Sequence, residues 1–351
     1  MSNSKHSQDA KDRYFMMLAI EQAKRGLYTT RPNPAVGCVI VQADKVVGQG
    51  FHPKAGQPHA EVFALKDAGT RAIGATAYVT LEPCSHTGRT PPCALGLIKA
   101  GIKRVVIAGL DPNPQVAGRG VKLLEQAGIA VTVGVLTAQA EALNKGFLKA
   151  MRSQMPYVRL KIATSLDGRT AMASGESKWI TGTAAREDVQ KLRAQSGVII
   201  TGSETVIVDN PQLNVRSNQL GINPEQVPQP KIVILDRRGR LEHDLQSDYQ
   251  LCQSPETLYW HEENLIELLK NLVSDHHCYD VLVEAGASVA GSFLQQQLVD
   301  ELIVYQAPCL LGTQARPMVA INPLALAQQL RFDIHSHEQL GTDLKLTLLP
   351  V

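Results

Sequence analysis

The chain has few cysteines, few aromatic residues and almost no net charge for its 351 residues. Six cysteines are too sparse for a disulfide scaffold, so they predict reduced thiols and a cytoplasmic protein. A net charge of +2 and an aromatic fraction of 5% do not indicate the basic, aromatic-rich surface of a nucleic-acid binder. No signal-peptide pattern is seen, and no apolar run approaches the ~18 residues that cross a bilayer. We therefore expect neither nucleic acid nor a membrane among the partners.

Helical and strand patterns alternate along the chain, which predicts an α/β fold with sheets covered by helices. The length favours two domains, and Met155-Pro156 interrupts a helical pattern, so we expect domains of residues 1–153 and 154–351. The first dozen residues are expected to fray. Helices are expected at residues 14–25, 59–68, 93–100, 121–126 and 137–152. Strands are expected at residues 36–41, 46–50, 75–81, 104–109, 129–134, 157–164, 197–202, 231–235, 281–284 and 301–307.

A His-x-Glu pair and two cysteines form the strongest motif of the first half. His59 and Glu61 lie in PHAE, and Cys84 and Cys93 lie in EPCSHTGRTPPC. H-x-E followed by P-C-x-x-C is typical of zinc deaminases, although the cysteines here are nine positions apart. One imidazole and two thiolates would hold one zinc ion per chain and leave its fourth position open to water.

The residue types explain the expected chemistry. Zinc acidifies its water, and the resulting hydroxide can attack an amino-bearing ring carbon. Glu61 would carry protons to the ring and to the departing ammonia. Because residues two positions apart do not share a helix face, His59 and Glu61 can meet only near the N-terminal end of a helix.

Several alternatives stay open from the residues alone. A closed structural zinc site would need a fourth ligand, for which His52 and His86 are candidates. Cys84 and Cys93 could also be plain core cysteines. Two other classes are a nucleic-acid base deaminase with an unrelated targeting domain and a non-catalytic, zinc-stabilised binding module. The remaining cysteines have no ligand spacing and are interpreted as structural or surface residues: Cys38, Cys252, Cys278 and Cys309.

The second half carries weaker signals. Residues 283–292, VEAGASVAGS, link an apolar strand to a helix, and small residues there would let the backbone approach a phosphate. The segment has neither the P-loop lysine nor G-x-G-x-x-G, so a plain strand–helix turn is the alternative. Arg193 and Arg216 could clamp a phosphate, and the alternative for both is a solvated surface charge.

Longer stretches resemble the family of bacterial bifunctional riboflavin-biosynthesis deaminase–reductases. In the first half these are RPNPAVGC at residues 31–38, PHAE, TLEPCSHTGRTPPC and DPNPQVAGRG at residues 111–120. In the second half they are KIATSLDGRTA, SGESKWIT, LRAQSGVIITGSETVIVDNPQLNVR and LVDELIVYQAPCLLG. The resemblance implies a cytidine-deaminase-like α/β/α domain followed by a dihydrofolate-reductase-like α/β domain. The last forty residues carry no such signal.

The resemblance also implies two reactions on one small-molecule substrate. The first is zinc-dependent hydrolytic deamination of a diaminopyrimidinone that carries a ribosyl 5′-phosphate. The second is NADPH-dependent reduction of the ribosyl side chain to ribityl. We expect a homo-oligomer, either a dimer or a tetramer.

The resemblance assigns further residues in the second half. Contacts to the dinucleotide are expected from Ala163, Trp179, Thr205, Asp209, Gly286, Ala287, Ser288, Val289, Ala290, Gly291 and Ser292. Contacts to the phosphosugar substrate are expected from Ser177, Arg193, Leu213, Arg216 and Glu284. Lys161 is a weaker candidate near the transferred hydride. Arg237 or Arg238 could meet the 2′-phosphate of NADPH, although solvated surface charges are the favoured interpretation of both. No residue of this half is assigned a certain catalytic role.

Overall fold

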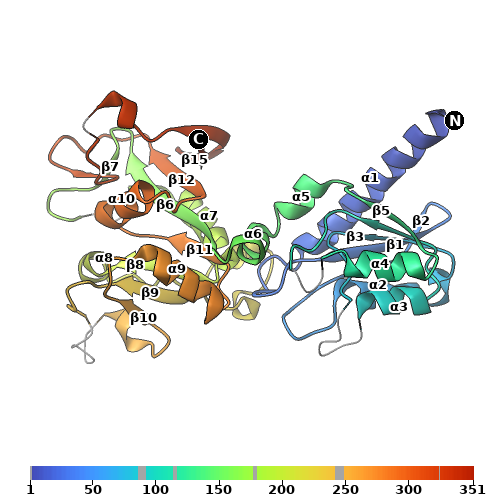
Figure 1. The fold of residues 1–351 in the computed structure, drawn as a ribbon. Helices are drawn as coiled ribbons and strands as arrows, with labels where there is room; N and C mark the ends of the chain where they lie inside the picture. Colours follow the sequence, from blue (N-terminus) through green and yellow to red (C-terminus); the bar gives the residue numbers. More distant parts are fainter. Residues whose placement is uncertain (1, 86–91, 114–116, 177–179, 242–248, 324) are drawn as a thin grey trace. The chain divides into compact units, whose positions relative to one another are not determined.

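The chain divides into two compact units, Met1–Ser153 and Gln154–Val351, each built on its own central sheet (Figure 1). The computed structural model describes residues 2–85, 92–113, 117–176, 180–241, 249–323 and 325–351. None of the helices within these ranges combines the length and the apolarity needed to cross a membrane.

The N-terminal unit contains a five-stranded sheet in the order β2-β1-β3-β4-β5. Strands β1 (Gly37–Gln42) and β2 (Lys45–Phe51) form an antiparallel hairpin, and β1 is also antiparallel to β3 (Thr76–Val79). Strands β4 (Arg104–Ile107) and β5 (Ala130–Val133) continue the sheet in parallel. The five expected strands of this half are therefore all present, some of them shorter than expected.

Helices cover both faces of this sheet (Figure 1). Helix α1 (Ser2–Lys24) packs on one face through an apolar stripe that includes Phe15, Met16 and Ile20. Helices α2 (Ala60–Ala68), α3 (Cys93–Lys99) and α4 (Arg119–Gln126) pack on the other face. A 3₁₀ turn, η1 (Gly69–Ala72), follows α2. The face with α2 and α3 is the one that carries the zinc motif.

Helix α2 lies unusually close to strand β2 because the strand presents glycine to it. A Cβ atom on Gly50 would come within 2.5 Å of the carbonyl oxygen of Ala60 and within 2.6 Å of the backbone nitrogen of Ala64. Only glycine leaves room for this approach, which fixes the start of α2, and therefore His59 and Glu61, against the sheet.

The single helix expected over residues 137–152 is wrong, because the chain forms α5 (Thr137–Glu141) and α6 (Lys145–Ser153) with a break between them. At the break, the side chain of Asn144 accepts a hydrogen bond from the backbone N–H of Ala35 at 2.7 Å and donates one to its carbonyl at 2.9 Å. Asn144 thus completes the backbone hydrogen bonding of a distant loop, and local periodicity does not reveal such a contact.

Helix α1 is longer than the helix expected over residues 14–25, because it begins at Ser2. In α1, Gln8 donates a hydrogen bond to Asp12, and Asp12 forms a two-pronged ion pair with Arg104 of β4. The partner that anchors this part of α1 is thus 92 residues away in the sequence.

The C-terminal unit contains an eight-stranded sheet. Its first six strands run parallel and its last two form an antiparallel hairpin. In spatial order the strands are β10 (Leu258–Trp260), β9 (Lys231–Leu235), β8 (Val198–Gly202), β11 (Asp280–Val283), β6 (Tyr157–Ser165), β12 (Glu301–Ala307), β15 (Asp343–Pro350) and β14 (Phe332–Leu340). Two short strands, β7 (Arg169–Ala171) and β13 (Arg316–Pro317), pair separately.

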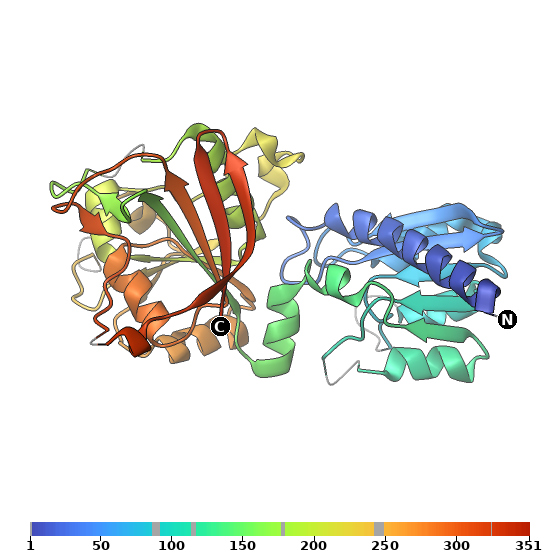
Figure 2. The same ribbon diagram turned by 90° about the horizontal axis from the view of Figure 1, so that it is seen from above.

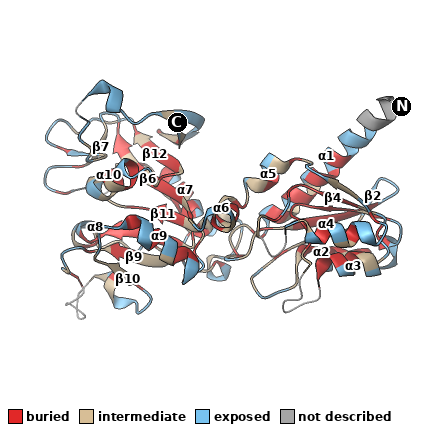
Figure 3. Ribbon diagram, viewed as in Figure 1, coloured by how far each residue is buried: buried red, intermediate tan, exposed pale blue. Residues whose placement is uncertain are grey.

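Helices again cover both faces, so the central strands are buried (Figure 3). Helices α7 (Thr183–Gln195) and α8 (Ser203–Asp209) pack on one face, and α9 (Leu265–Ser274) and α10 (Ala287–Gln295) pack on the other. Short 3₁₀ turns lie in the connections at η2 (Asn218–Leu220), η3 (Pro224–Gln226), η4 (Gln250–Gln253) and η5 (Leu326–Gln328). Because β8 and β11 are parallel neighbours, the loops after them emerge at the same edge of the sheet, where ligands commonly bind.

Within the last forty residues, which carry no sequence signal, residues 332–350 form the β14–β15 hairpin beside β12 (Figure 2). The hairpin also forms polar contacts with α7 and its N-cap residue. Asp343 accepts a hydrogen bond from the backbone N–H of Gly182 at 2.6 Å, and Lys345 forms an ion pair with Asp188. The C-terminal segment therefore supports the helix that carries Arg193.

Candidate active sites

His59, Cys84 and Cys93 converge in the N-terminal unit as the sequence predicts. Nδ1 of His59 lies 3.3 Å from Sγ of Cys93 and 3.6 Å from Sγ of Cys84, and all three ligand atoms lie within 4.8 Å of one another. A tetrahedral zinc ion with ordinary Zn–N and Zn–S bond lengths separates its ligand atoms by about 3.5–3.8 Å. The donor set and its spacing therefore fit zinc.

Each of the three ligands lies where a helix starts or a strand has just ended. His59 is the N-cap residue of α2, Cys93 is the first residue of α3, and Cys84 lies five positions after the end of β3. The backbone N–H of Cys93 donates to Sγ of Cys84 at 3.3 Å. Hydrogen bonds from Cys93 and from His59 lower the pKa of Cys84, which favours the thiolate that a metal requires.

Glu61 lies in the first turn of α2 and is only 3% exposed. Its Oε2 atom is buried, and no described residue forms a hydrogen bond with it. Burial raises the pKa of Glu61 to about 7, although its own backbone N–H and His59 oppose the rise. A carboxyl group with a pKa near neutrality can accept a proton and return it, so the site contains a group suited to proton transfer.

The structure does not support His52 as a fourth ligand. Its Nδ1 atom lies 3.1 Å from the carbonyl oxygen of Pro58, and its Nε2 atom lies 3.1 Å from Nδ2 of Asn33. Both ring nitrogens thus have protein partners, and within the described residues the candidate metal cluster comprises only the three predicted ligands. His86, the other candidate, lies outside the described residues.

The C-terminal unit contains a cavity of about 620 Å³ at the edge of the sheet where β8 and β11 end. Most of the second-half residues assigned from the resemblance line it: Ala163, Arg193, Thr205, Asp209, Leu213, Arg216, Glu284, Gly286, Ala287, Ser288 and Val289. Lys161 also lines it. Ser177 and Trp179 lie outside the described residues.

The small-residue segment after β11 forms the start of α10. Gly286 is the N-cap residue and offers no side chain to the free N–H groups of the first turn, so an anion can approach them.

The expected contacts further along α10 differ from one another. Ser292 lines a second cavity of about 590 Å³, together with Arg237 and Arg238. Ala290 is buried in the core, and a Cβ on Gly291 would lie 2.2 Å from the Ala320 carbonyl oxygen. Ala290 and Gly291 therefore pack against other residues, and neither lines either of the two cavities.

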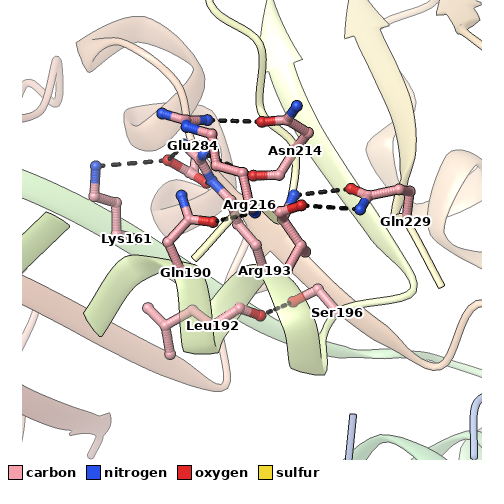
Figure 4. Close-up of polar contacts among 10 residues, drawn as sticks. Lys161, Gln190, Leu192, Arg193, Ser196, Asn214, Arg216, Gln229 and Glu284 are labelled. Atoms are coloured by element: carbon pink, nitrogen blue, oxygen red, sulfur yellow. Dashed lines mark hydrogen bonds and ion pairs between the residues drawn. The ribbon is translucent and has the colours of Figure 1, made fainter. Parts of the chain in front are cut away.

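A buried ion pair forms one wall of the larger cavity (Figure 4). Nε of Arg193 donates to Oε1 of Glu284 at 2.7 Å, and Nη2 donates to Oε2 at 3.1 Å. Nζ of Lys161 lies 3.6 Å from the same Oε2 atom. Burial by itself raises the pKa of Glu284, but Arg193 and Lys161 outweigh it and lower the pKa to about 2. Glu284 therefore stays ionised throughout the neutral range.

Arg216 is the more available of the two predicted phosphate clamps. The guanidinium group of Arg193 donates to Glu284 and to the carbonyl oxygen of Asn214. The guanidinium group of Arg216 is exposed, and among the described residues it donates one hydrogen bond, to Oδ1 of Asn214, at 2.7 Å (Figure 4). Burial and the nearby Arg193 lower the pKa of Arg216. Two guanidinium groups facing one cavity are a suitable setting for a phosphate.

Comparison with known proteins identifies both units. Residues 9–109 match the cytidine and deoxycytidylate deaminase zinc-binding region, and residues 156–346 match the RibD C-terminal domain. The riboflavin biosynthesis protein RibD of Haemophilus influenzae is 50% identical over 97% of this chain and 98% of its own length. This chain belongs to the RibD family.

Solved RibD structures share the whole fold. The RibD structure from Acinetobacter baumannii is 55% identical, with a TM-score of 0.94 over 98% of this chain and 99% of that one. A diaminohydroxyphosphoribosylaminopyrimidine deaminase/5-amino-6-(5-phosphoribosylamino)uracil reductase from Thermotoga maritima is 32% identical, with a TM-score of 0.86 over 98% and 100%. The predictions of the two-part α/β fold, of a bifunctional deaminase and reductase of riboflavin biosynthesis, and of zinc and NADPH as cofactors are confirmed.

Sequence reasoning missed several side chains that line or support the RibD reductase cavity. Gln190 and Tyr305 line it, and Oε1 of Gln190 accepts a hydrogen bond from the backbone N–H of Arg216 at 2.8 Å. The hydroxyl group of Tyr305 donates to the buried carboxylate of Asp188 at 2.8 Å. Tyr305 and Asp188 are 117 positions apart, so no local pattern could have linked them.

The depressed pKa of Glu284 predicts a pH-dependent stability of the C-terminal unit. Folding lowers this pKa from 4.5 to about 2, so the ionised form stabilises the folded unit by roughly 3 kcal/mol. Ionised Glu284 makes its full contribution to the free energy of unfolding above the unfolded pKa, and this contribution is lost as the pH falls from about 4.5 toward 2. The Glu284→Gln variant lacks this contribution and leaves Arg193 buried without a carboxylate, so its free energy of unfolding near pH 7 should be lower by about 3–5 kcal/mol.

Urea unfolding of both proteins, followed by tryptophan fluorescence, measures this effect. Both tryptophans of the chain, Trp179 and Trp260, belong to the C-terminal unit, so the signal reports that unit alone. The gap in unfolding free energy between wild type and variant should narrow steadily below about pH 4.5. A gap that stays constant down to pH ~3 would contradict the assigned ion pair.

Proposed function

We propose that the N-terminal unit deaminates 2,5-diamino-6-ribosylamino-4(3H)-pyrimidinone 5′-phosphate and that the C-terminal unit then reduces the ribosyl chain of the product to ribityl. The Thermotoga relative named above carries a description that pairs a deaminase and a reductase of this kind. The main support for the deamination step is the Oε2 atom of Glu61, which is buried near the three ligand residues and has no hydrogen-bond partner among the described residues.

In the proposed deaminase site, His59, Cys84 and Cys93 hold the metal and Glu61 moves the protons. Bound zinc would supply Lewis acidity, which makes water a nucleophile near neutral pH. Glu61 takes one proton from the attacking water and passes it to the ring nitrogen next to the reacting carbon. The C–N bond then breaks, ammonia leaves with a second proton that Glu61 relays, and the ring gains a carbonyl group.

In the proposed reductase site, the side chains of the larger cavity orient substrate and cofactor. NADPH would supply the hydride. The turn at Gly286 and the start of α10 would hold the dinucleotide phosphates, and Arg237 or Arg238 in the adjoining cavity would meet the 2′-phosphate. Arg216 would bind the phosphate of the substrate, with Arg193 and Glu284 beside it. Lys161, which lines the same cavity, is the candidate to lie near the transferred hydride.

Glu61→Gln tests the deaminase assignment. The variant keeps the shape of the side chain but cannot accept a proton, so ammonia release should fall by about 10²–10⁴-fold while zinc stays bound. Zinc is measured by atomic emission and ammonia by a colorimetric assay. NADPH oxidation is followed separately with the already deaminated substrate, and it should be unchanged.

Glu125→Gln is the matched control, because Glu125 is an exposed residue of α4 and should give wild-type ammonia release. Ammonia release by Glu61→Gln within about threefold of wild type would show that another group transfers the protons. If the wild-type chain binds zinc tightly but shows neither ammonia release nor NADPH oxidation, the structural-zinc alternative would be favoured.

Arg216→Gln tests the reductase assignment. Loss of one charge-assisted hydrogen bond to a phosphate should raise KM for the phosphorylated substrate by about 10–100-fold and leave KM for NADPH unchanged. Lys270→Gln removes an exposed positive charge from α9 of the same unit and serves as the control. An unchanged substrate KM, or an equal rise in KM for NADPH, would assign Arg216 to another role.

We also propose that the protein is a homo-oligomer, a dimer or a tetramer, in the cytoplasm. All six cysteines are free, which fits a reducing compartment. Multi-angle light scattering of the purified chain should give two or four times its mass of 38.1 kDa. A single-chain mass across the micromolar range would disprove the oligomer.

A further inference from the structure

Glu82 is a buried carboxylate that accepts hydrogen bonds from four backbone N–H groups. It lies two residues before Cys84 and is 4% exposed. Its Oε2 atom accepts from the N–H groups of Asp111 at 3.3 Å and Gly118 at 3.0 Å. Its Oε1 atom accepts from those of Gly120 at 2.9 Å and Val121 at 3.2 Å. All four donors belong to one segment, residues 111–121, which lies 29–39 positions further along the chain.

These donors replace water around the buried charge. In the part of the chain that the structure describes, no lysine or arginine forms an ion pair with Glu82, so backbone dipoles provide its main compensation. Gly120 and Val121 lie in the first turn of α4, where free N–H groups and the helix dipole favour a negative charge. The segment includes the motif DPNPQVAGRG, to which neither proposed reaction assigns a role.

A second contact joins the same two segments. A Cβ atom on Gly120 would lie 2.0 Å from the carbonyl oxygen of Pro83, so only glycine allows α4 to approach the backbone next to Cys84 so closely. On its other side, the carbonyl oxygen of Cys84 accepts a hydrogen bond from the N–H of Ala94 in α3 at 3.2 Å. The backbone around Cys84 is thus fixed to two helices, to α4 through Glu82 and to α3 directly.

We propose that Glu82 is a positioning residue for the metal site. Its carboxylate fixes the Pro83-Cys84 segment against the start of α4, and this directs Sγ of Cys84 toward His59 and Cys93. Glu82 acts through Cys84 and does not itself touch the metal or the substrate. This inference rests on the ligand set of the proposed function.

Glu82→Gln tests the proposal. The amide retains the size of the side chain, but its NH₂ group would face two backbone N–H donors, so the segment should shift. The apparent Kd for zinc, measured by competition with a chromophoric chelator, should rise at least about tenfold. The visible d–d spectrum of the cobalt-substituted protein should change as well, because it reports the geometry of the ligands.

Two further variants separate positioning from general stability. Gly120→Ala disturbs the same contact from the α4 side without altering a charge, and it should also weaken zinc binding and change the cobalt spectrum. Asp12→Asn removes a buried carboxylate of the same unit from the opposite face of the sheet. It should lower the unfolding free energy but leave zinc affinity and the cobalt spectrum as in wild type.

The outcomes distinguish this inference from the proposed function. Wild-type zinc affinity and cobalt spectrum in both Glu82→Gln and Gly120→Ala would overturn the positioning role. If Glu82→Gln does not fold, Gly120→Ala decides by the same two measurements. Zinc binding that survives in Cys84→Ser would instead show that the proposed ligand set is wrong.

Discussion

Free backbone N–H groups at the starts of helices face the metal site, the segment that carries Cys84 and the larger cavity, and the chemistry of both units depends on them. The first turn of α4 receives the carboxylate of Glu82, and the first residue of α3 donates its N–H to the sulfur of Cys84. In the C-terminal unit, the uncapped start of α10 opens into the edge of the larger cavity. Helix starts are therefore common to the metal site and to the expected dinucleotide site, although the two units have different sheets.

The buried carboxylates show how the fold separates structural from reactive groups. Glu82 accepts hydrogen bonds from backbone donors, and Glu284 contacts Arg193 and Lys161, which keep the pKa of Glu284 low. Glu61 is equally buried, but its Oε2 atom lacks a hydrogen-bond partner among the described residues and its pKa rises to about 7. The difference lies in the partners and not in the residue type, because all three side chains are glutamates.

Periodicity and turn residues predicted most of the elements, and the failures have identifiable causes. The helix expected over residues 137–152 breaks at Asn144 because that side chain bonds to Ala35, 109 positions earlier. The β14–β15 hairpin gave no signal, since most of β14 is solvent-exposed at the edge of the sheet and shows no clear alternation of burial. His52 resembled a ligand in the sequence, but its ring nitrogens are occupied by Pro58 and Asn33.

The sequence by itself determined the kind of chemistry. One imidazole, two thiols and a carboxyl group stand in two motifs with a recognisable pattern, PHAE and EPCSHTGRTPPC, and their identities restrict the metal and the reaction before any fold is known. Only the tertiary structure decided which other groups serve that chemistry. Glu82 meets its donors across 29–39 positions, and Arg193 meets Glu284 across 91. Contacts at such separations depend on how strands and helices pack, so local sequence patterns do not predict them.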